Sequence, residues 1–191
     1  NDLLDREIDI FIEIAKQISP IVNDKATEGI VLVSAPPLSD NRFCEMKKAG
    51  ISKVVFNLEA LCLENFKKFC PGKNDLGYDF WLNQLKKAVE VFGVGNVWSN
   101  LVLGLESNSE CLEKCNEISQ LGIVLSANVL HLDKGNSLNC HIPSMNHVID
   151  FFYHLNIIYK QYSYLPFYCS KALRTSLSNE VYDNRVIQKD G

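Results

Sequence analysis

Four short apolar segments that alternate with helical segments constrain the fold of this chain more than any other feature. Their β-branched and other apolar residues are typical of strands that are buried on both faces of a parallel sheet. The expected strands are 30–33, 51–56, 97–103 and 123–130. Apolar residues recur at helical spacing in the intervening segments. Strands and helices in this order form parallel β/α units with right-handed crossovers, so the sequence predicts an α/β fold.

The expected helices are 3–18, 39–50, 63–70, 78–92, 110–120 and 145–162. We expect Pro20 to end the first helix, Ser39 to cap the second, and Pro71 with Gly72 to stop the third. From Leu165 onward the tail reads as irregular. The sequence therefore predicts a β/α region over residues 1–142, followed by a long helix and tail over 143–191 that pack on it.

Composition excludes several functional classes. The chain has 191 residues, of which 47% are hydrophobic and 22% charged, and its formal net charge is −4. A nucleic-acid-binding protein normally has a basic face, which this charge balance does not favour. No apolar run approaches the roughly 18 residues of a membrane-spanning helix. We therefore expect no nucleic-acid partner, no membrane partner and a cytoplasmic location.

Polar residues cluster where the predicted strands end. They are Ser34, Asn57, Glu59, Asn100, Glu106, Asn128, His131 and Asp133. In parallel α/β proteins ligands bind at the carboxyl ends of the strands, in closed barrels and in doubly wound sheets alike. A polar side chain next to a buried strand must find a partner or face a cavity. The chain has no G-x-G-x-x-G or Walker A motif, so these positions predict a small-molecule site of another kind.

Three stretches resemble the radical S-adenosylmethionine superfamily, in its biotin-synthase-like branch. Leu38-Ser39-Asp40 through Ala49-Gly50 to Asn57-Leu58-Glu59 resembles the third helix and fourth strand of that branch. Gly104-Leu105-Glu106 resembles the fifth strand. Asn128-Val129-Leu130, with Lys134-Gly135-Asn136-Ser137-Leu138 after it, resembles the sixth strand and its exit loop. The resemblance covers about residues 30–140 and implies a partial (β/α) TIM-type barrel.

The resemblance also implies an activity and cofactors. Members bind S-adenosylmethionine against a 4Fe–4S cluster, cleave it to a 5′-deoxyadenosyl radical, and abstract a hydrogen atom from a small substrate. It places Asn57 and Glu59 at the cofactor or substrate, backbone near Val102 at the adenine, and Asn128 at the substrate. Strand geometry alone adds Ser34 to the cofactor contacts and Asn100 and His131 to the substrate contacts.

The cysteines depart from the superfamily pattern. Its C-x-x-x-C-x-x-C cluster loop is absent, and the chain begins at Asn1 without a methionine, so we expect a fragment that lacks the first strands. Cys111 and Cys115 have the first spacing, but Ile118 stands where the third cysteine would follow. Leu32 and Trp98 replace the cysteines that hold the auxiliary cluster of biotin synthase, which argues against sulfur insertion. A metal-ligand role for Cys169 in the tail is disfavoured, because no second cysteine follows it.

Two other functions stay open at this point. One is a non-catalytic, degenerate half-barrel that acts as a binding or scaffold domain, completed by a missing amino-terminal segment or a partner chain. The other is an unrelated α/β enzyme that uses Glu59 or His131 for acid–base catalysis. The leading hypothesis is a radical S-adenosylmethionine protein fragment, inactive as it stands because the cluster cysteines are absent.

Overall fold

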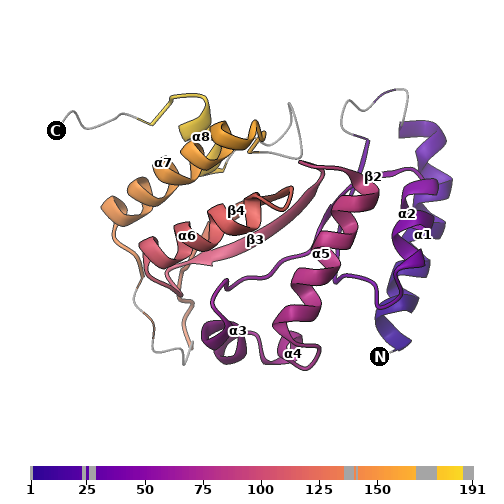
Figure 1. Cartoon of the computed structure of the whole chain (residues 1–191), viewed down its shortest axis with the longest axis horizontal. Coiled ribbons are helices and arrows are strands. Elements are labelled where there is room, and N and C mark those ends of the chain that lie inside the picture. Colours follow the sequence, from indigo (N-terminus) through magenta and orange to yellow (C-terminus); the bar gives the residue numbers. More distant parts are fainter. Residues whose placement is uncertain are drawn as a thin grey trace.

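A computed structural model describes residues 2–22, 25, 29–135, 140, 142–166 and 176–186. It has an α/β fold, in which a four-stranded, all-parallel sheet alternates with helices (Figure 1). The strands are β1 (Ile30–Val33), β2 (Ile51–Val55), β3 (Val97–Leu103) and β4 (Ile123–Val129). The helices are α1 (Asp2–Val22), α2 (Asn41–Lys48), α3 (Leu63–Phe69), α4 (Pro71–Asn74), α5 (Tyr78–Phe92), α6 (Asn108–Ser119), α7 (Met145–Tyr162) and α8 (Leu177–Tyr182).

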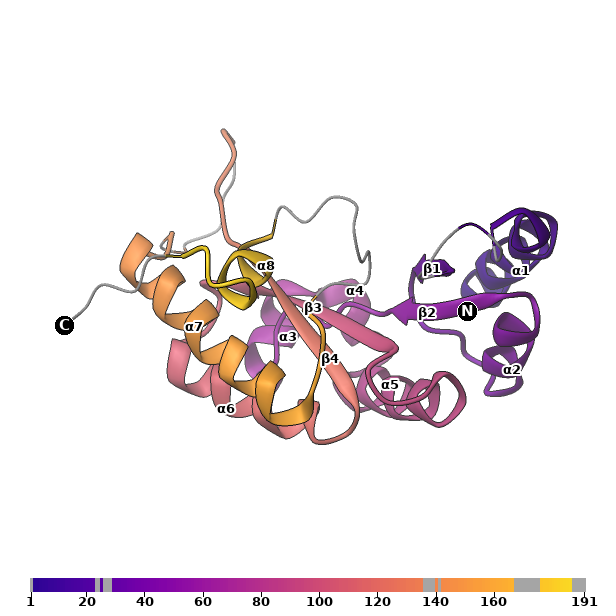
Figure 2. The same cartoon turned by 90° about the horizontal axis from the view of Figure 1, so that it is seen from above.

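The sheet is open, and its strands follow the order of the chain, β1-β2-β3-β4. All three strand pairs are parallel, which confirms the predicted β/α units. One row of the register runs straight across the sheet and joins Val33, Val55, Trp98 and Val124. The helices α2, α5 and α6 lie along one side of this row of strands (Figure 2).

The two sides of the sheet differ in burial. On the side that these helices cover, alternate strand residues are buried; they are Leu32, Val54, Val97, Ser99, Leu101, Leu103, Ile123, Leu125 and Ala127. The opposite side, which we call the open side, is buried at Val55, Trp98 and Val124, but Val33 is 52% exposed and Asn128 is also exposed. A parallel sheet with both faces covered would bury both sets, so this sheet has helices over one face and a partly accessible second face.

Helix α7 protects the outer edge of β4. The N–H of Leu130 donates to the carbonyl oxygen of Leu103 in β3 at 2.9 Å, so by alternation the Leu125 carbonyl points away from β3. The buried Tyr159 hydroxyl donates to that Leu125 oxygen at 2.6 Å. Burial raises the pKa of Tyr159 above its ordinary value. The hydroxyl thus satisfies a backbone carbonyl that no strand pairs with.

Several predicted helix ends are wrong. Pro20 does not end the first helix, which continues to Val22, because the missing N–H of a proline costs less near a helix end than in its middle. Ser39 does not cap α2; Asp40 precedes that helix, and the Ser39 hydroxyl donates to Asp5 Oδ2 at 2.9 Å. Pro71 starts the new helix α4 in addition to following α3. The tail was expected to be irregular, but it contains α8.

The predicted 78–92 and 145–162 helices and the 97–103 strand match the structure residue for residue. In the described part of the chain, no helix is long and apolar enough to cross a membrane.

Candidate functional site

A row of polar side chains crosses the open side of the sheet, beginning just after the end of β2 and continuing through the middle of β3 and β4. Asn57 follows β2, Asn100 lies in β3, and Ser126 lies opposite Asn100 in β4. Asn57 Oδ1 accepts a hydrogen bond from the Asn100 backbone N–H at 3.2 Å. Asn100 Oδ1 accepts one from the Ser126 hydroxyl. The structure therefore brings two of the predicted residues together, and we call Asn57, Asn100 and Ser126 the polar row.

The polar row lies between an apolar row and an accessible one. Behind it, Val55, Trp98 and Val124 are almost fully buried. In front of it, half-buried Val102 pairs with exposed Asn128. The side-chain amides of Asn100 and Asn128 donate to no described residue, so each can donate to a ligand. Apolar walls with a few convergent polar groups are the usual lining of a small-molecule site.

Asn57 also has a structural role in the sheet. Val55 pairs with Trp98, and Glu59 forms the next bridge, with Leu101. Between these two pairs the chain advances by four residues after β2 but by only three in β3, so one extra residue forms a β-bulge on the β2 side. Asn57 Oδ1 takes the Asn100 N–H, and the buried Ser99 hydroxyl accepts from the Leu58 N–H at 2.9 Å. Two side chains thus replace the backbone acceptors that the bulge removes.

Glu59 lies apart from the polar row. Its φ of 69° is in the left-handed region, which few residues other than glycine adopt. Both its N–H and its carbonyl bond to β3, which holds this conformation. Its carboxylate forms an ion pair with Lys73 Nζ at 3.0 Å, and both side chains are 28% exposed. Lys73 also donates to the Asn57 carbonyl and lies over the Trp81 ring, 5.0 Å from its centroid. Glu59 therefore fastens helix α4 to the end of β2.

The remaining predicted residues lie at different places. The Ser34 hydroxyl donates to the Ala35 carbonyl at 2.8 Å. The Val102 N–H donates to the Glu59 carbonyl at 2.8 Å and is therefore already engaged. His131 is highly exposed; its Nδ1 lies 3.6 Å from an Asp133 oxygen. These three do not join the polar row through hydrogen bonds of the described residues.

Sequence reasoning missed Lys73, Ser99 and Ser126. Ser126 has the same strand parity as Asn128, and this alternation was the signal that could have identified it. Lys73 gave no such signal, because its contact with Glu59 depends on how the α3–α4 segment folds back.

Glu106 organises the loop after β2. Its Oε1 accepts from the N–H groups of Leu61 and Cys62, at 2.9 and 2.6 Å. Burial raises the pKa of Tyr78 to about 12, and the Glu106 charge adds to this shift. The phenol is consequently neutral at physiological pH. Both side chains are half-buried, and Glu106 holds the backbone that follows β2 in place.

The described residues contain no group of three histidine, cysteine, aspartate or glutamate side chains that could hold a metal ion. Cys111 and Cys115 lie side by side on α6 and are buried. Burial raises the pKa of the Cys115 thiol well above its usual value, which opposes a thiolate ligand there. The described part of the chain therefore does not fit a 4Fe–4S cluster. Cys169 lies outside the described residues, as does the stretch 136–139.

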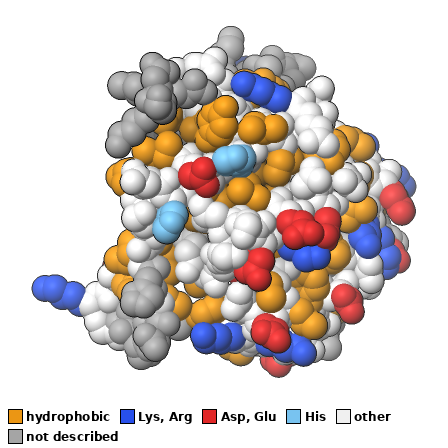
Figure 3. Space-filling model, turned by 60° about the vertical axis from the view of Figure 1, so that its left-hand side comes forward, with side chains coloured by type: hydrophobic (Ala, Val, Ile, Leu, Met, Phe, Trp, Pro, Cys, Tyr) orange, Lys and Arg blue, Asp and Glu red, His pale blue; other side chains and the backbone are white. Residues whose placement is uncertain are grey.

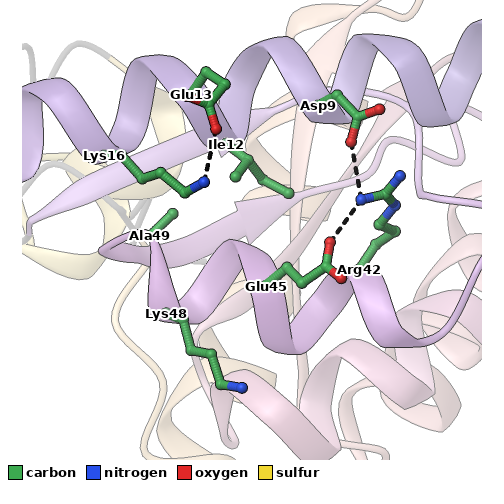
Figure 4. A pocket seen from close by; sticks show the side chains of 8 residues that line it. All are labelled: Asp9, Ile12, Glu13, Lys16, Arg42, Glu45, Lys48 and Ala49. Carbon is green, nitrogen blue, oxygen red and sulfur yellow. Dashed lines mark hydrogen bonds and ion pairs between the residues drawn. The ribbon is translucent and has the colours of Figure 1, made fainter.

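A separate groove of about 430 Å³ lies between α1 and α2 (Figure 4). Arg42 bridges Asp9 and Glu45 across it, at 2.9 and 2.6 Å. Glu13 and Lys16 form a second ion pair, so Lys48 is the one charged lining residue without an ion pair to a described residue, and the groove offers a ligand little unpaired charge. On the face shown in Figure 3, acidic and basic side chains lie next to one another among hydrophobic ones.

Comparisons of the chain with known protein families, with curated proteins and with solved structures returned no match.

Proposed function

We propose that this chain is the later part of a β/α barrel of radical S-adenosylmethionine type, and that it supplies the wall against which the cofactor and a small substrate lie. The observation that carries the proposal is the polar row and Asn128 on a sheet face free of the covering helices. In a closed barrel that face is the interior, and ligands bind at the carboxyl ends of its strands.

The available groups suit a nucleoside-containing ligand. The amides of Asn100 and Asn128 can donate to, and accept from, an adenine edge, a ribose hydroxyl or the aminoacyl group of S-adenosylmethionine. The half-buried Val102 side chain offers an apolar contact between them. Glu59 has no ligand contact in this arrangement, since Lys73 holds its carboxylate. A ribose diol could reach that carboxylate only by displacing Lys73.

In the superfamily that the sequence resembles, a 4Fe–4S cluster supplies the electron that cleaves S-adenosylmethionine. The described residues offer no ligand set for such a cluster. Within the proposal this chain therefore binds and orients ligand, and the cluster ligands belong to polypeptide outside the described part. Anaerobic treatment with iron and sulfide should leave the chain without a stoichiometric 4Fe–4S absorbance. A stable cluster would contradict this division of roles.

Binding of S-adenosylmethionine tests the proposal directly. Isothermal titration or equilibrium dialysis should detect binding to the chain. Asn128→Ala should weaken binding about two- to tenfold, because a well-placed hydrogen bond between uncharged groups contributes about 0.5–1.5 kcal/mol and about 1.4 kcal/mol corresponds to a factor of ten. Asn146→Ala is the matched control, since Asn146 is also exposed and lies on α7, away from the sheet. We expect the control to bind like the parent chain.

Absence of binding at millimolar S-adenosylmethionine would refute the proposal, as would equal effects of Asn128→Ala and Asn146→Ala. Unfolding measurements on both variants separate lost binding from lost structure.

One observation favours a second candidate, a non-catalytic binding or scaffold domain. Asn57 and Glu59, the two residues assigned by resemblance to the cofactor, are both used by the fold itself. Such a domain would bind no S-adenosylmethionine and still unfold cooperatively, so the same titration distinguishes the two functions.

A further inference from the structure

Helix α1 carries a second seam on the side opposite to its buried face. Ile8, Ile12 and Ala15 point into the core. At heptad spacing on the other side stand six exposed residues, which we call the outer seam: Leu3, Glu7, Ile10, Ile14, Gln17 and Ile21. The alternating steps of four and three residues are those of a coiled-coil contact line. Four of the six are large aliphatic residues, exposed by 75, 60, 47 and 63% in chain order.

The outer seam complements itself when it is read in the opposite direction. In an antiparallel pair centred between Ile10 and Ile14, Leu3 meets Ile21, Glu7 meets Gln17, and Ile10 meets Ile14 of the second helix. Every apolar position then faces an apolar one. The Glu7 carboxylate can accept a hydrogen bond from the Gln17 amide, so the polar positions match too.

The flanks of the outer seam support the same register. On the side toward the core, Leu4 would lie opposite Ile18, and Phe11 opposite its own copy. On the other side, Glu13 is already neutralised by Lys16, with an N–O distance of 2.6 Å. A parallel pair would instead place Glu7 against Glu7, and like charges at a contact line are destabilising.

We propose that α1 is a self-association surface, on which a second copy of this chain docks with its own α1 antiparallel. The contact is isologous: each matched pair occurs twice around a two-fold axis, and the assembly closes as a dimer. The α1 end of the described structure lies opposite the α7 end in both views (Figures 1 and 2), and all six residues of the outer seam are exposed.

Helix α7 has exposed apolar residues as well, namely Met145, Ile149, Tyr153 and Ile157. They are spaced by four residues throughout, so each step turns about 40° around the helix, and the set winds away from any straight contact line. It has no antiparallel complement of the kind found on α1, and we assign the dimer contact to α1 alone.

Light scattering after size exclusion, or sedimentation equilibrium, tests the proposal on the whole chain. The chain has a mass of 21.6 kDa, and a dimer has twice that mass. Ile14→Asp places a carboxylate in both central pairs and should weaken the dimer about 100-fold or more. Ile157→Asp is the matched control, because Ile157 is equally exposed at 47%. Circular dichroism should show that both variants keep their helices.

Cross-linking tests the register. Chains with Leu3→Cys should form few new disulfides with one another, whereas a mixture of Leu3→Cys and Ile21→Cys chains should form a mixed disulfide above the background of the exposed native Cys44. A monomeric parent chain at tens of micromolar would overturn the proposal. So would a dimer that survives Ile14→Asp but not Ile157→Asp, or cross-links between Leu3→Cys chains that exceed the mixed product.

Discussion

The bulge after β2 gives a prediction that separates the structural from the ligand-binding interpretation of Asn57. Asn57→Ala removes the acceptor of the Asn100 N–H, 3.2 Å away, while the backbone acceptor at that position is already displaced. An amide left without a partner costs about 1–3 kcal/mol. Asn57 is half-buried, so water can partly replace it, and we expect a loss of about 1–2 kcal/mol in the free energy of unfolding.

Asn57→Asp is the matched variant, because a carboxylate oxygen can still accept the Asn100 N–H. It should retain at least half of the stability that Asn57→Ala loses. Urea unfolding at constant m-value measures both, and a chain of this size should show a Tm change of about 2–4 °C for each kcal/mol. The reasoning is refuted if Asn57→Ala is as stable as the parent chain. Equal destabilisation by the alanine and aspartate variants would refute it as well.

Two further substitutions test the edge of β4 and the turn before it. Tyr159→Phe should cost about 1–2 kcal/mol at pH 7, because the Leu125 carbonyl loses its donor. Burial raises the folded-state pKa of Tyr159, so the stability that Tyr159 contributes is complete below the unfolded-state pKa of about 10 and falls as the pH rises above it. Between pH 8 and pH 10.5, urea unfolding should therefore show a smaller loss of stability in Tyr159→Phe than in the parent chain. An equal loss in the two proteins would contradict the assignment. Gly122→Ala should cost about 1–3 kcal/mol, since φ is +91° and the new Cβ would lie 2.8 Å from a Val89 methyl carbon. Gly72→Ala, where a Cβ meets nothing within 4 Å, should be neutral or stabilising, and similar thermal melts for the two alanine variants would contradict this account.

The strands and most helices were predictable because they follow from local periodicity, and their alternation predicted the parallel β/α units. The 97–103 strand and the 78–92 and 145–162 helices have strong, uninterrupted patterns and clear flanking residues, and the structure matches them. The expectation for Pro20 was wrong, because the first helix continues past it to Val22, whereas α3 ends at Phe69, just before Pro71, as expected. A proline at the first position of a helix removes no hydrogen bond, because that N–H has no intrahelical acceptor. Pro20 removes only the bond to the carbonyl of residue 16, and the helix continues for two more residues, so a proline does not show by itself where a helix ends.

The candidate site was predictable only where side chains alternate regularly between the two faces of a strand. Asn100 and Asn128 were both expected to contact the substrate, and both lie on the open side. Glu59 was expected, by resemblance, to contact the cofactor or substrate together with Asn57. The bulge between β2 and β3 shifts the register by one residue and pairs Glu59 with Leu101, whose side chain is buried on the helix-covered side. No sequence pattern predicts this bulge. The side chains that accept the hydrogen bonds of the displaced backbone N–H groups, Asn57 and Ser99, belong to different segments of the chain.

The hydrogen bond from the Tyr159 hydroxyl to the outward-pointing Leu125 carbonyl of β4 determines at which edge the sheet could accept another strand. A further strand placed beside β4 would compete with this phenol for the Leu125 oxygen and would have to move α7 away. The outer edge of β1 pairs with no described strand. In the larger barrel that we propose, additional strands from this polypeptide or another would therefore join beside β1 rather than beside β4.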